Sequence, residues 1–273
     1  MPSQRNNLGD FNVNGSKNTR MEMDNSFKDF DFRKDEVMHL GRYMNSAMTM
    51  TKISKSLGRP IRVLDIGCGE INTVRLFYRS FMEKKTDVIE EYIGVDIDYK
   101  MVEKAHEKYG RTYEACNAKH VIQDLTVNPH LDYPDGYFDF IVCFEFMEHI
   151  KQQFLPAILK EAFRVLNPAG KALFSTPNSN GSNAALPKDH IYEYSYEECC
   201  SLFKDAGFTL TDSVGVCVNI SRIPDEEKQD WSDEMKKIYN AFGENSAFAC
   251  VALAPLFSPV YCKNVVYHLS KSE

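Results

Sequence analysis

A short apolar run that ends in a glycine turn constrains this chain more than any other segment. Residues 62–69 read Arg-Val-Leu-Asp-Ile-Gly-Cys-Gly, so the run carries Asp65 and leads directly into Gly67 and Gly69. This pattern is typical of a buried parallel strand that turns sharply into a helix. Glycine tolerates positive φ and has no Cβ, so the backbone of such a turn can approach a bound nucleotide closely.

A second apolar run supports the same interpretation. Residues 92–95 read Tyr-Ile-Gly-Val and are followed by Asp96 and a helical pattern. A carboxylate at the end of the second strand of a βαβ unit can accept hydrogen bonds from both hydroxyls of a ribose. A lone Gly-x-Gly is weak evidence, but the two runs together predict a nucleotide site.

Further strands are expected at 118–122, 138–144 and 171–175, with helices between them. This alternation predicts a parallel sheet with right-handed crossovers. Ligands of such sheets bind beyond the carboxyl ends of the strands. Asp124 and Glu145 fall at those ends, so we expect them to converge with Gly67 and Asp96 on one crevice.

The rest of the chain divides into additions to this sheet. Residues 1–33 lack periodicity and predict a flexible tail, and 34–58 predict a helical cap that either covers a sheet edge or closes over the ligand. The remaining 59–273 form the main domain, with last strands at 208–218 and 265–269 and a helical insert at about 219–258 between them. The apolar residues of the insert form either a lid or the packed face of a helix. These residues are Trp231, Met235, Ile238, Tyr239 and Phe242.

Composition limits the partners and the compartment. The formal net charge of -7 argues mildly against a dedicated nucleic-acid binder. No apolar run is long enough to span a membrane, and the first residues lack the apolar core of a signal peptide. The 8 cysteines include no Cys-x-x-Cys pair, so we expect reduced thiols and a cytoplasmic location.

Five ordered segments resemble the class I S-adenosylmethionine-dependent methyltransferases: 63–69, 94–98, 123–125, 138–142 and 166–171. The resemblance implies a Rossmann-like sandwich whose seven-stranded sheet is mostly parallel, with one antiparallel strand near an edge and helices on both faces. It also implies S-adenosylmethionine as the cofactor. The positions that match the family's cofactor site are Asp65, Gly67, Cys68, Gly69, Asp96, Ile97, Met101, Asp124, Leu125 and Glu145.

The resemblance assigns a part of the cofactor to each of these places. The glycine turn holds the methionine part, Asp96 the ribose, and Asp124 the adenine amine. Ile71 departs from the family pattern, because many relatives have a third glycine there. A nicotinamide-dependent dehydrogenase is disfavoured by the same missing glycine and by the long spacing from Asp65 to Asp96.

The segment Phe-Glu-Phe-Met-Glu-His at 144–149 carries candidate chemistry. One turn of helix would gather Glu145, Glu148 and His149, whose oxygen and nitrogen atoms suit Mg²⁺, Mn²⁺ or Zn²⁺. The spacing resembles that of ubiquinone-type O-methyltransferases and of enzymes that methylate the terminal 2′-hydroxyl of small RNAs. The second resemblance extends to Thr-Pro-Asn at 176–178 and implies His190 as a further ligand.

Three functions stay open from the sequence. The first is methyl transfer to an oxygen of a small molecule, with His149 and Glu148 as catalytic residues, either with a metal or with His149 as a metal-free base. The second is metal-dependent 2′-O-methylation of RNA or another modified nucleic acid. The third is a catalytically silent regulator that binds the cofactor.

Overall fold

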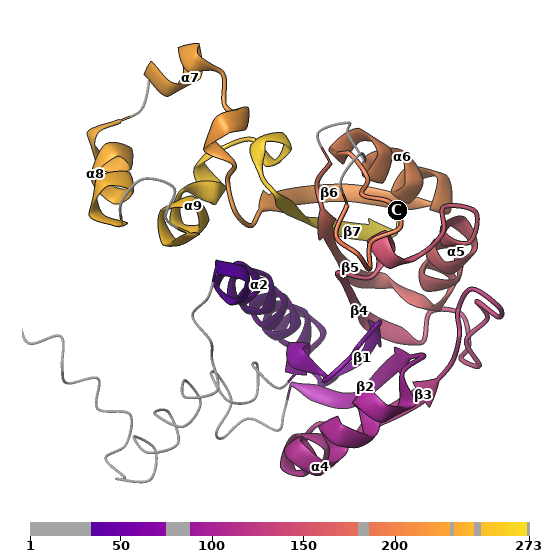
Figure 1. Cartoon of the computed structure of the whole chain (residues 1–273). Coiled ribbons are helices and arrows are strands. Elements are labelled where there is room, and N and C mark those ends of the chain that lie inside the picture. Colours follow the sequence, from indigo (N-terminus) through magenta and orange to yellow (C-terminus); the bar gives the residue numbers. More distant parts are fainter. Residues whose placement is uncertain (1–33, 75–87, 180–185, 230–231, 243–246, 272–273) are drawn as a thin grey trace, which may run out of the picture.

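The computed structural model describes residues 34–74, 88–179, 186–229, 232–242 and 247–271, and these form a seven-stranded sheet with helices on both faces (Figure 1). The expected flexible tail at 1–33 lies outside the described residues. The strand order is β3-β2-β1-β4-β5-β7-β6. The predicted fold class is confirmed.

The direction of the strands follows the expected pattern. The strands are β1 (Ile61–Ile66), β2 (Ile89–Asp96), β3 (Ala118–Ile122), β4 (Phe138–Phe144), β5 (Leu166–Pro177), β6 (Phe208–Gly215) and β7 (Asn264–Lys271). Neighbours from β3 to β5 are parallel, whereas β7 runs antiparallel to both β5 and β6. The carboxyl ends of β1, β2, β3 and β4 therefore meet at one edge of the sheet.

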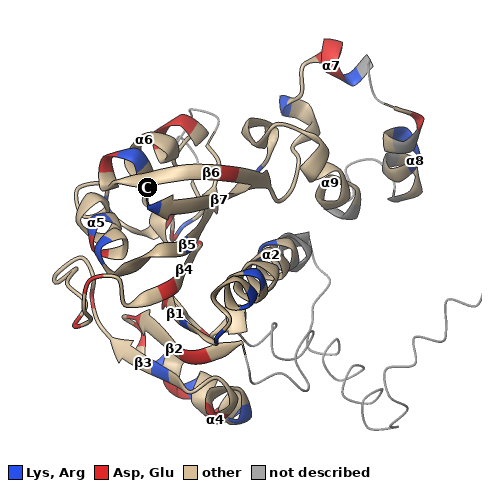
Figure 2. Ribbon diagram, turned by 180° about the vertical axis from the view of Figure 1, so that it is seen from behind, with Lys and Arg blue, Asp and Glu red and all other residues tan. Residues whose placement is uncertain are grey.

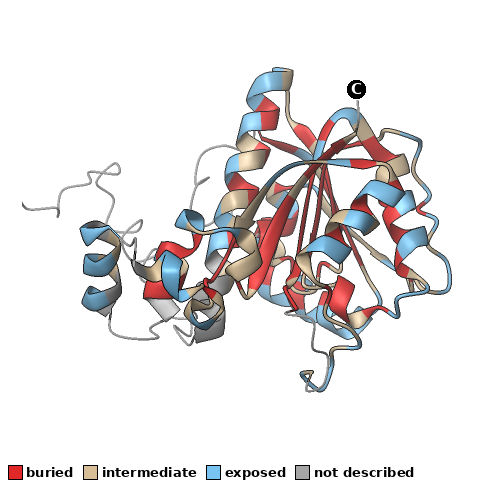
Figure 3. Cartoon of the chain, turned by 90° about the horizontal axis from the view of Figure 1, so that it is seen from above, coloured by how far each residue is buried: buried red, intermediate tan, exposed pale blue. Residues whose placement is uncertain are grey.

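Helices cover the two faces of the sheet separately. The long α2 (Lys34–Leu57) and α4 (Tyr99–Ala115) lie on one face, and α5 (Leu155–Val165) and α6 (Tyr196–Ala206) lie on the other (Figure 1). Helix α6 begins with a capping box between Ser195 and Glu198 and ends at Gly207 in the left-handed region. Figure 3 shows buried strands between helices whose outer sides are exposed.

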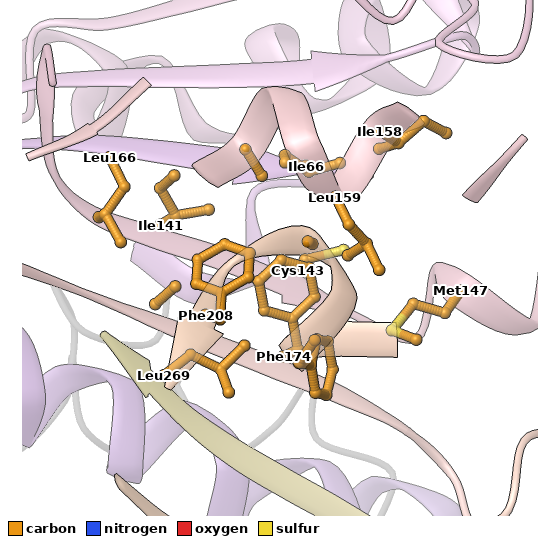
Figure 4. Close-up of a cluster of buried hydrophobic side chains, with 14 of the residues drawn as sticks. Ile66, Ile141, Cys143, Met147, Ile158, Leu159, Leu166, Phe174, Phe208 and Leu269 are labelled. Carbon is orange, nitrogen blue, oxygen red and sulfur yellow. The ribbon is translucent and has the colours of Figure 1, made fainter. Parts of the chain in front are cut away.

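The central strand β4 explains why the core has two halves. All seven of its residues are buried, as an interior parallel strand requires. Successive side chains point to opposite faces, so Ile141 and Cys143 pack toward α5 and α6, while Phe140 and Val142 pack toward α2 and α4. Figure 4 shows the first of these clusters, in which Phe174 and Phe208 meet edge to face and Cys143 lies in the same cluster.

Several strand boundaries differ from the sequence prediction, including the start of β5 and the end of β6. Residues 167–170 read as a turn before the fifth strand, but they form an irregular part of β5, which already pairs with β4 at Leu166. The side chain of Asn167 accepts a hydrogen bond from the amide of Ala169, so the turn chemistry survives as a bulge inside the strand. Strand β6 ends at Gly215 rather than near Val218, which keeps only an isolated bridge to Cys262.

The insert between β6 and β7 projects from the sheet. It contains α7 (Asp225–Gln229), α8 (Asp233–Phe242) and α9 (Ala247–Leu253), and α9 packs against α2 (Figure 1). Met235 and Ile238 pack on a small cluster of buried side chains of the insert, whereas Trp231 and the side chains of Tyr239 and Phe242 lie outside the described residues. Within the described ranges, none of the helices has the length and apolar character that crossing a bilayer requires.

Candidate active site

A cavity of about 320 Å³ lies over the glycine turn that follows β1. The turn itself forms one wall through Gly67, Cys68 and Gly69, with Asp65 behind it. Helix α2 closes the opposite side with His39 and Tyr43, and further lining residues are Met101, Phe144 and Glu145. The predicted helical cap therefore contributes side chains to this cavity.

The backbone of the turn has the shape that a nucleotide cradle needs. Gly67 has φ 71 and Gly69 has φ 48, both in the left-handed region. A Cβ at Gly67 would lie 2.6 Å from the Phe146 ring, so no other residue fits there without displacement. Ile71 also has positive φ, at 52, which is unfavourable for a β-branched residue. The chain therefore keeps the turn geometry at the position where many relatives have a third glycine.

Asp96 connects the turn after β1 to the end of β2. Its Oδ2 accepts a hydrogen bond from the amide of Gly69 at 2.9 Å, and its Oδ1 accepts one from the amide of Asp98 at 2.9 Å. A carboxylate offers about four lone-pair positions, so both oxygens can still accept from a ribose. Asp98 in turn caps α4 by accepting from the amides of Lys100 and Met101.

The next stretch of the same edge suits a flat base. Ile97 is 62% exposed directly after Asp96, whereas Leu125 is buried. Asp124 accepts hydrogen bonds through Oδ1 from the hydroxyl and the amide of Thr126, and these bonds lower the pKa of Asp124. An exposed apolar side chain flanked by two carboxylates could cover one face of an adenine and hold its polar edge.

Asp65 is the most perturbed carboxyl group at the cavity. It points to the α2 face of the sheet, where it is 3% exposed. Burial raises the pKa of Asp65 to about 7, although hydrogen bonds from Tyr92 and Thr73 oppose the shift. The Tyr92 hydroxyl donates to its Oδ2 at 2.6 Å. A cationic ligand in the cavity would favour the ionised form of this group.

Glu145 faces away from the candidate metal ligands with which the sequence grouped it. It follows β4 with φ 51, and its carboxylate forms an ion pair with Arg42 of α2 at 2.6 Å. It also accepts hydrogen bonds from Ser175 at 3.1 Å and Asn264 at 3.0 Å. The expected helical turn that gathers Glu145 with Glu148 and His149 does not form, because the 3₁₀ turn η1 spans only Met147–His149.

The other three candidate ligands come together. Ligand atoms of Glu148, His149 and His190 all lie within 4.8 Å of one another. The Nδ1 of His149 lies 2.8 Å from the carbonyl oxygen of Asp189, and the Nδ1 of His190 lies 2.7 Å from Glu193 Oε1. A nitrogen next to such acceptors carries the proton, so each ring keeps the Nε2 lone pair for a ligand.

One carboxylate oxygen of Glu148 lacks a hydrogen-bond partner among the described residues, and a bound cation would supply the missing interaction. Its side chain is almost fully buried, and Oε2 accepts from the Thr176 hydroxyl at 3.0 Å, whereas Oε1 has no partner among the described residues. Burial, followed by the charge of Glu145, raises the pKa of Glu148 to about 8. The geometry and the chemistry of the three donors therefore fit a divalent ion.

Two backbone hydrogen bonds to one carbonyl oxygen hold this group together. The amides of Ile191 and Tyr192 both donate to the carbonyl oxygen of Glu148, at 2.8 and 3.2 Å. These bonds dock the His190 segment against η1. The sequence implied His190 only through a resemblance. It did not predict the role of Arg42, which lies in a segment expected to form only a helical cap.

Comparisons with known proteins show the family to which this chain is similar. The family described as "Methyltransferase domain" matches residues 41–213. A protein of Mycolicibacterium smegmatis named as a probable S-adenosylmethionine-dependent methyltransferase is 33% identical over 158 residues, which cover 56% of this chain and 54% of that protein. The chain thus spans about half the length of this relative.

Two further relatives differ in the atom that their names say is methylated. Phosphoethanolamine N-methyltransferase 1 of Arabidopsis thaliana is 31% identical and covers 54% of this chain and 28% of that protein. A ubiquinone biosynthesis O-methyltransferase of Psychrobacter arcticus is 24% identical, with coverages of 58% and 63%. These relatives do not distinguish oxygen from nitrogen as the acceptor.

Solved structures share the fold at low identity. The [4+2]-cyclase SpnF has a TM-score of 0.53 at 17% identity, and covers 82% of this chain and 80% of that one. The PH0226 protein from Pyrococcus horikoshii OT3 has a TM-score of 0.50 at 16% identity, with coverages of 91% and 99%. Since one of them is named as a cyclase, the fold alone does not define the reaction.

Proposed function

The chain belongs to the class I S-adenosylmethionine-dependent methyltransferases, and from this we propose that it methylates an oxygen of a small-molecule acceptor with the help of a divalent metal ion. The observation that carries the proposal is the group of Glu148, His149 and His190, in which the buried Glu148 Oε1 has no partner among the described residues.

The cofactor would lie along the carboxyl edge of the sheet. The turn with Gly67 and Gly69 would receive its methionine part, and Asp96 its ribose hydroxyls. Asp124, Ile97 and Leu125 would surround its adenine. Asp65 and Glu145 place carboxyl groups at the cavity, which suits a ligand that carries a positive sulfonium.

Methyl transfer requires little covalent chemistry from the protein. The bond from the methyl carbon to the sulfonium breaks as the bond to the acceptor oxygen forms, and the sulfur leaves as a neutral thioether. Most of the acceleration then comes from aligning the acceptor behind the methyl group and excluding water. Tyr43 and His39 of α2 would help to exclude water from this cavity.

A hydroxyl acceptor must also lose its proton, which would pass to water. Glu148, His149 and His190 would hold a divalent ion, which supplies the Lewis acidity that lowers the pKa of a bound hydroxyl. Their Nδ1 partners, the Asp189 carbonyl and Glu193, would keep both imidazoles oriented. In this arrangement His149 is a ligand rather than a base.

A small acceptor is favoured over RNA by charge. The chain carries a formal net charge of -7, and Figure 2 shows basic segments interspersed with acidic ones over the described elements. Phosphate backbones bind extended basic surfaces. RNA stays a second candidate because His190, which the resemblance to the small-RNA enzymes implied, lies with Glu148 and His149.

An activity screen with metal control tests the proposal. The purified chain would receive radiolabelled S-adenosylmethionine with a catechol, phosphoethanolamine or a short RNA with a free 3′ end. We expect label on the catechol, a loss of at least about 100-fold with EDTA or Glu148→Gln, and recovery from EDTA on adding Mn²⁺. Glu197→Gln, an exposed carboxylate on α6, should retain full activity.

Other outcomes would contradict parts of the proposal. If phosphoethanolamine is methylated and EDTA has no effect, the proposed reaction would be wrong and the chain would instead catalyse metal-free N-methylation. Label on the RNA alone, still dependent on Mn²⁺, would keep the metal and change the acceptor class. Activity that survives Glu148→Gln would remove the metal group from the mechanism.

A further inference from the structure

A second cavity, of about 390 Å³, lies under the other end of α2. Its walls are the last turns of α2, the first part of β5, and the neighbouring strands β6 and β7. It shares no lining residue with the cavity over the glycine turn. We propose that this second cavity binds a small metabolite that carries a phosphate or carboxylate group, and that its occupancy favours cofactor binding.

Charge at the rim points to an anionic ligand. Lys52 of α2 and Lys171 of β5 both line the cavity and are exposed, and neither forms a salt bridge with another described residue. Among the described residues that line the cavity, Asp212 is the one acidic residue, and its Oδ1 already accepts from the amide of Ser213 at 2.8 Å. Two ammonium groups facing one carboxylate make a local positive site in a chain whose net charge is -7.

A buried polar atom on the wall lacks a partner. His268 pairs with Leu173 across β7 and β5, so its ring lies on the α2 face of the sheet. Its Nε2 is shielded from solvent and has no hydrogen-bond partner among the described residues. Buried polar atoms are normally satisfied, so a ligand in the cavity would supply the missing bond.

The size and the floor of the cavity limit the ligand further. At the ~30 Å³ that a water molecule occupies in the liquid, the cavity has room for roughly a dozen non-hydrogen atoms. Ile53, Leu57, Ala169 and Leu173 provide apolar contacts below the charged rim. A short carbon skeleton with one acidic group fits these surroundings, whereas a nucleic acid does not.

Helix α2 connects this cavity to the cofactor cavity. His39 and Tyr43 line the first cavity and Lys52 and Ser56 the second, within one continuous helix. At 1.5 Å per residue, His39 and Lys52 are about 20 Å apart along the helix axis. A ligand that fixes one end of the helix reduces the entropy lost when the other end is ordered. The two ligands should therefore strengthen each other's binding.

Calorimetric titration of the whole chain tests the proposal. The probes are inorganic phosphate, 3-phosphoglycerate and succinate, with glycerol as the uncharged control, each with and without saturating S-adenosylhomocysteine. We expect one site for at least one acidic probe, none for glycerol, and tighter binding when S-adenosylhomocysteine is present. The order of the three acidic probes separates phosphate from carboxylate recognition.

Matched variants locate the site. The double variant Lys52→Gln with Lys171→Gln should weaken binding of the acidic probe by about tenfold or more. The reason is that each lost hydrogen bond from a charged group removes a substantial part of the binding free energy. Lys160→Gln, an exposed lysine on α5, should leave it unchanged. All three side chains are exposed, so the variants should fold normally.

Three results would overturn the proposal. Equal affinity in the double variant and wild type would place the probe elsewhere. Competition between the probe and S-adenosylhomocysteine would assign it to the cofactor cavity. Absence of binding by every acidic probe, with or without S-adenosylhomocysteine, would remove the site even if methyl transfer is confirmed.

Discussion

Asp65 holds its carboxyl group in a part of the core that favours the neutral form. Burial raises its pKa from 3.8 to about 7, so the folded chain binds this proton more tightly than the unfolded chain does. The unfolded state is then the first to ionise as pH rises. We expect this residue to reduce the free energy of unfolding progressively between about pH 4 and pH 7, by up to about 4 kcal/mol.

Asp65→Asn measures this effect. The amide has almost the same shape and can still accept from Tyr92, but it has no proton to lose. Urea unfolding at pH 5 and pH 8 should show that the variant gains stability relative to wild type at the higher pH and has a clearly smaller advantage at the lower one. Parallel pH profiles for the two proteins would show that Asp65 titrates normally.

Single residues also show what could be read from the sequence. Gly67, Gly69 and Asp96 were predictable, because a glycine turn after one strand and a carboxylate after the next are fixed by local backbone requirements. The contacts of Glu145 were not predictable. A spacing of three residues suggests a helical turn, but the left-handed backbone at Glu145 directs its side chain to Arg42, 103 positions earlier in the chain, which no local pattern encodes.

At the scale of elements, the attachment of α2 depends on an ion pair between the buried Arg42 and the partly buried Glu145. The Arg42 side chain is fully buried, and its Nε and Nη2 have no partner among the described residues, so Glu145 is its main source of compensation. We expect Arg42→Met to cost about 3–5 kcal/mol of stability, because it leaves the Glu145 carboxylate without its cation.

A double-mutant cycle separates the pair from the packing of the helix. Arg42→Met, Glu145→Gln and the double variant would be compared by urea unfolding. The double variant should be more stable than the sum of the single losses predicts, with a coupling of about 2 kcal/mol. Additive losses would mean that the helix is held by its apolar side chains alone.

Elements were predicted well where burial is uniform and poorly where it is not. Strand β4 is apolar nearly throughout and was found at its predicted bounds, because an interior strand needs such a run on both faces. Strand β5 was predicted to begin at Lys171, five residues after its observed start. Its first residues carry turn-forming side chains and enter the sheet only as a bulge.

At the scale of the whole molecule, the cofactor cavity joins the sheet edge to α2. A ligand bound there should therefore stabilise both. S-adenosylhomocysteine at about 100 times its Kd should add about 2.7 kcal/mol to the free energy of unfolding. Hydrogen exchange should slow at the amides of α2 and of the turn at 67–69, with α8 unchanged.

Two variants make this result specific. Asp96→Ala removes the carboxylate expected to hold the ribose, so it should lose most of the stabilisation. Asp205→Ala, an exposed carboxylate on α6, should retain it. Full stabilisation of Asp96→Ala would show that the ligand does not lie along the carboxyl ends of β1 and β2.

The overall topology was predictable because alternating strands and helices leave few arrangements of a parallel sheet. The acceptor was not, because the insert between β6 and β7 lies outside residues 41–213, which the family matches, and part of that insert is outside the described residues.

The position of β7 in the sheet affects how the protein folds during its synthesis on the ribosome. Among the described strands, β6 has β7 as its one neighbour in the sheet, and β7 lies between β6 and β5 although it is made last of the three. Until β7 has been synthesised, β6 therefore lacks the strand with which it pairs. The nascent chain can close its edge only after residues 264–271 have emerged from the exit tunnel.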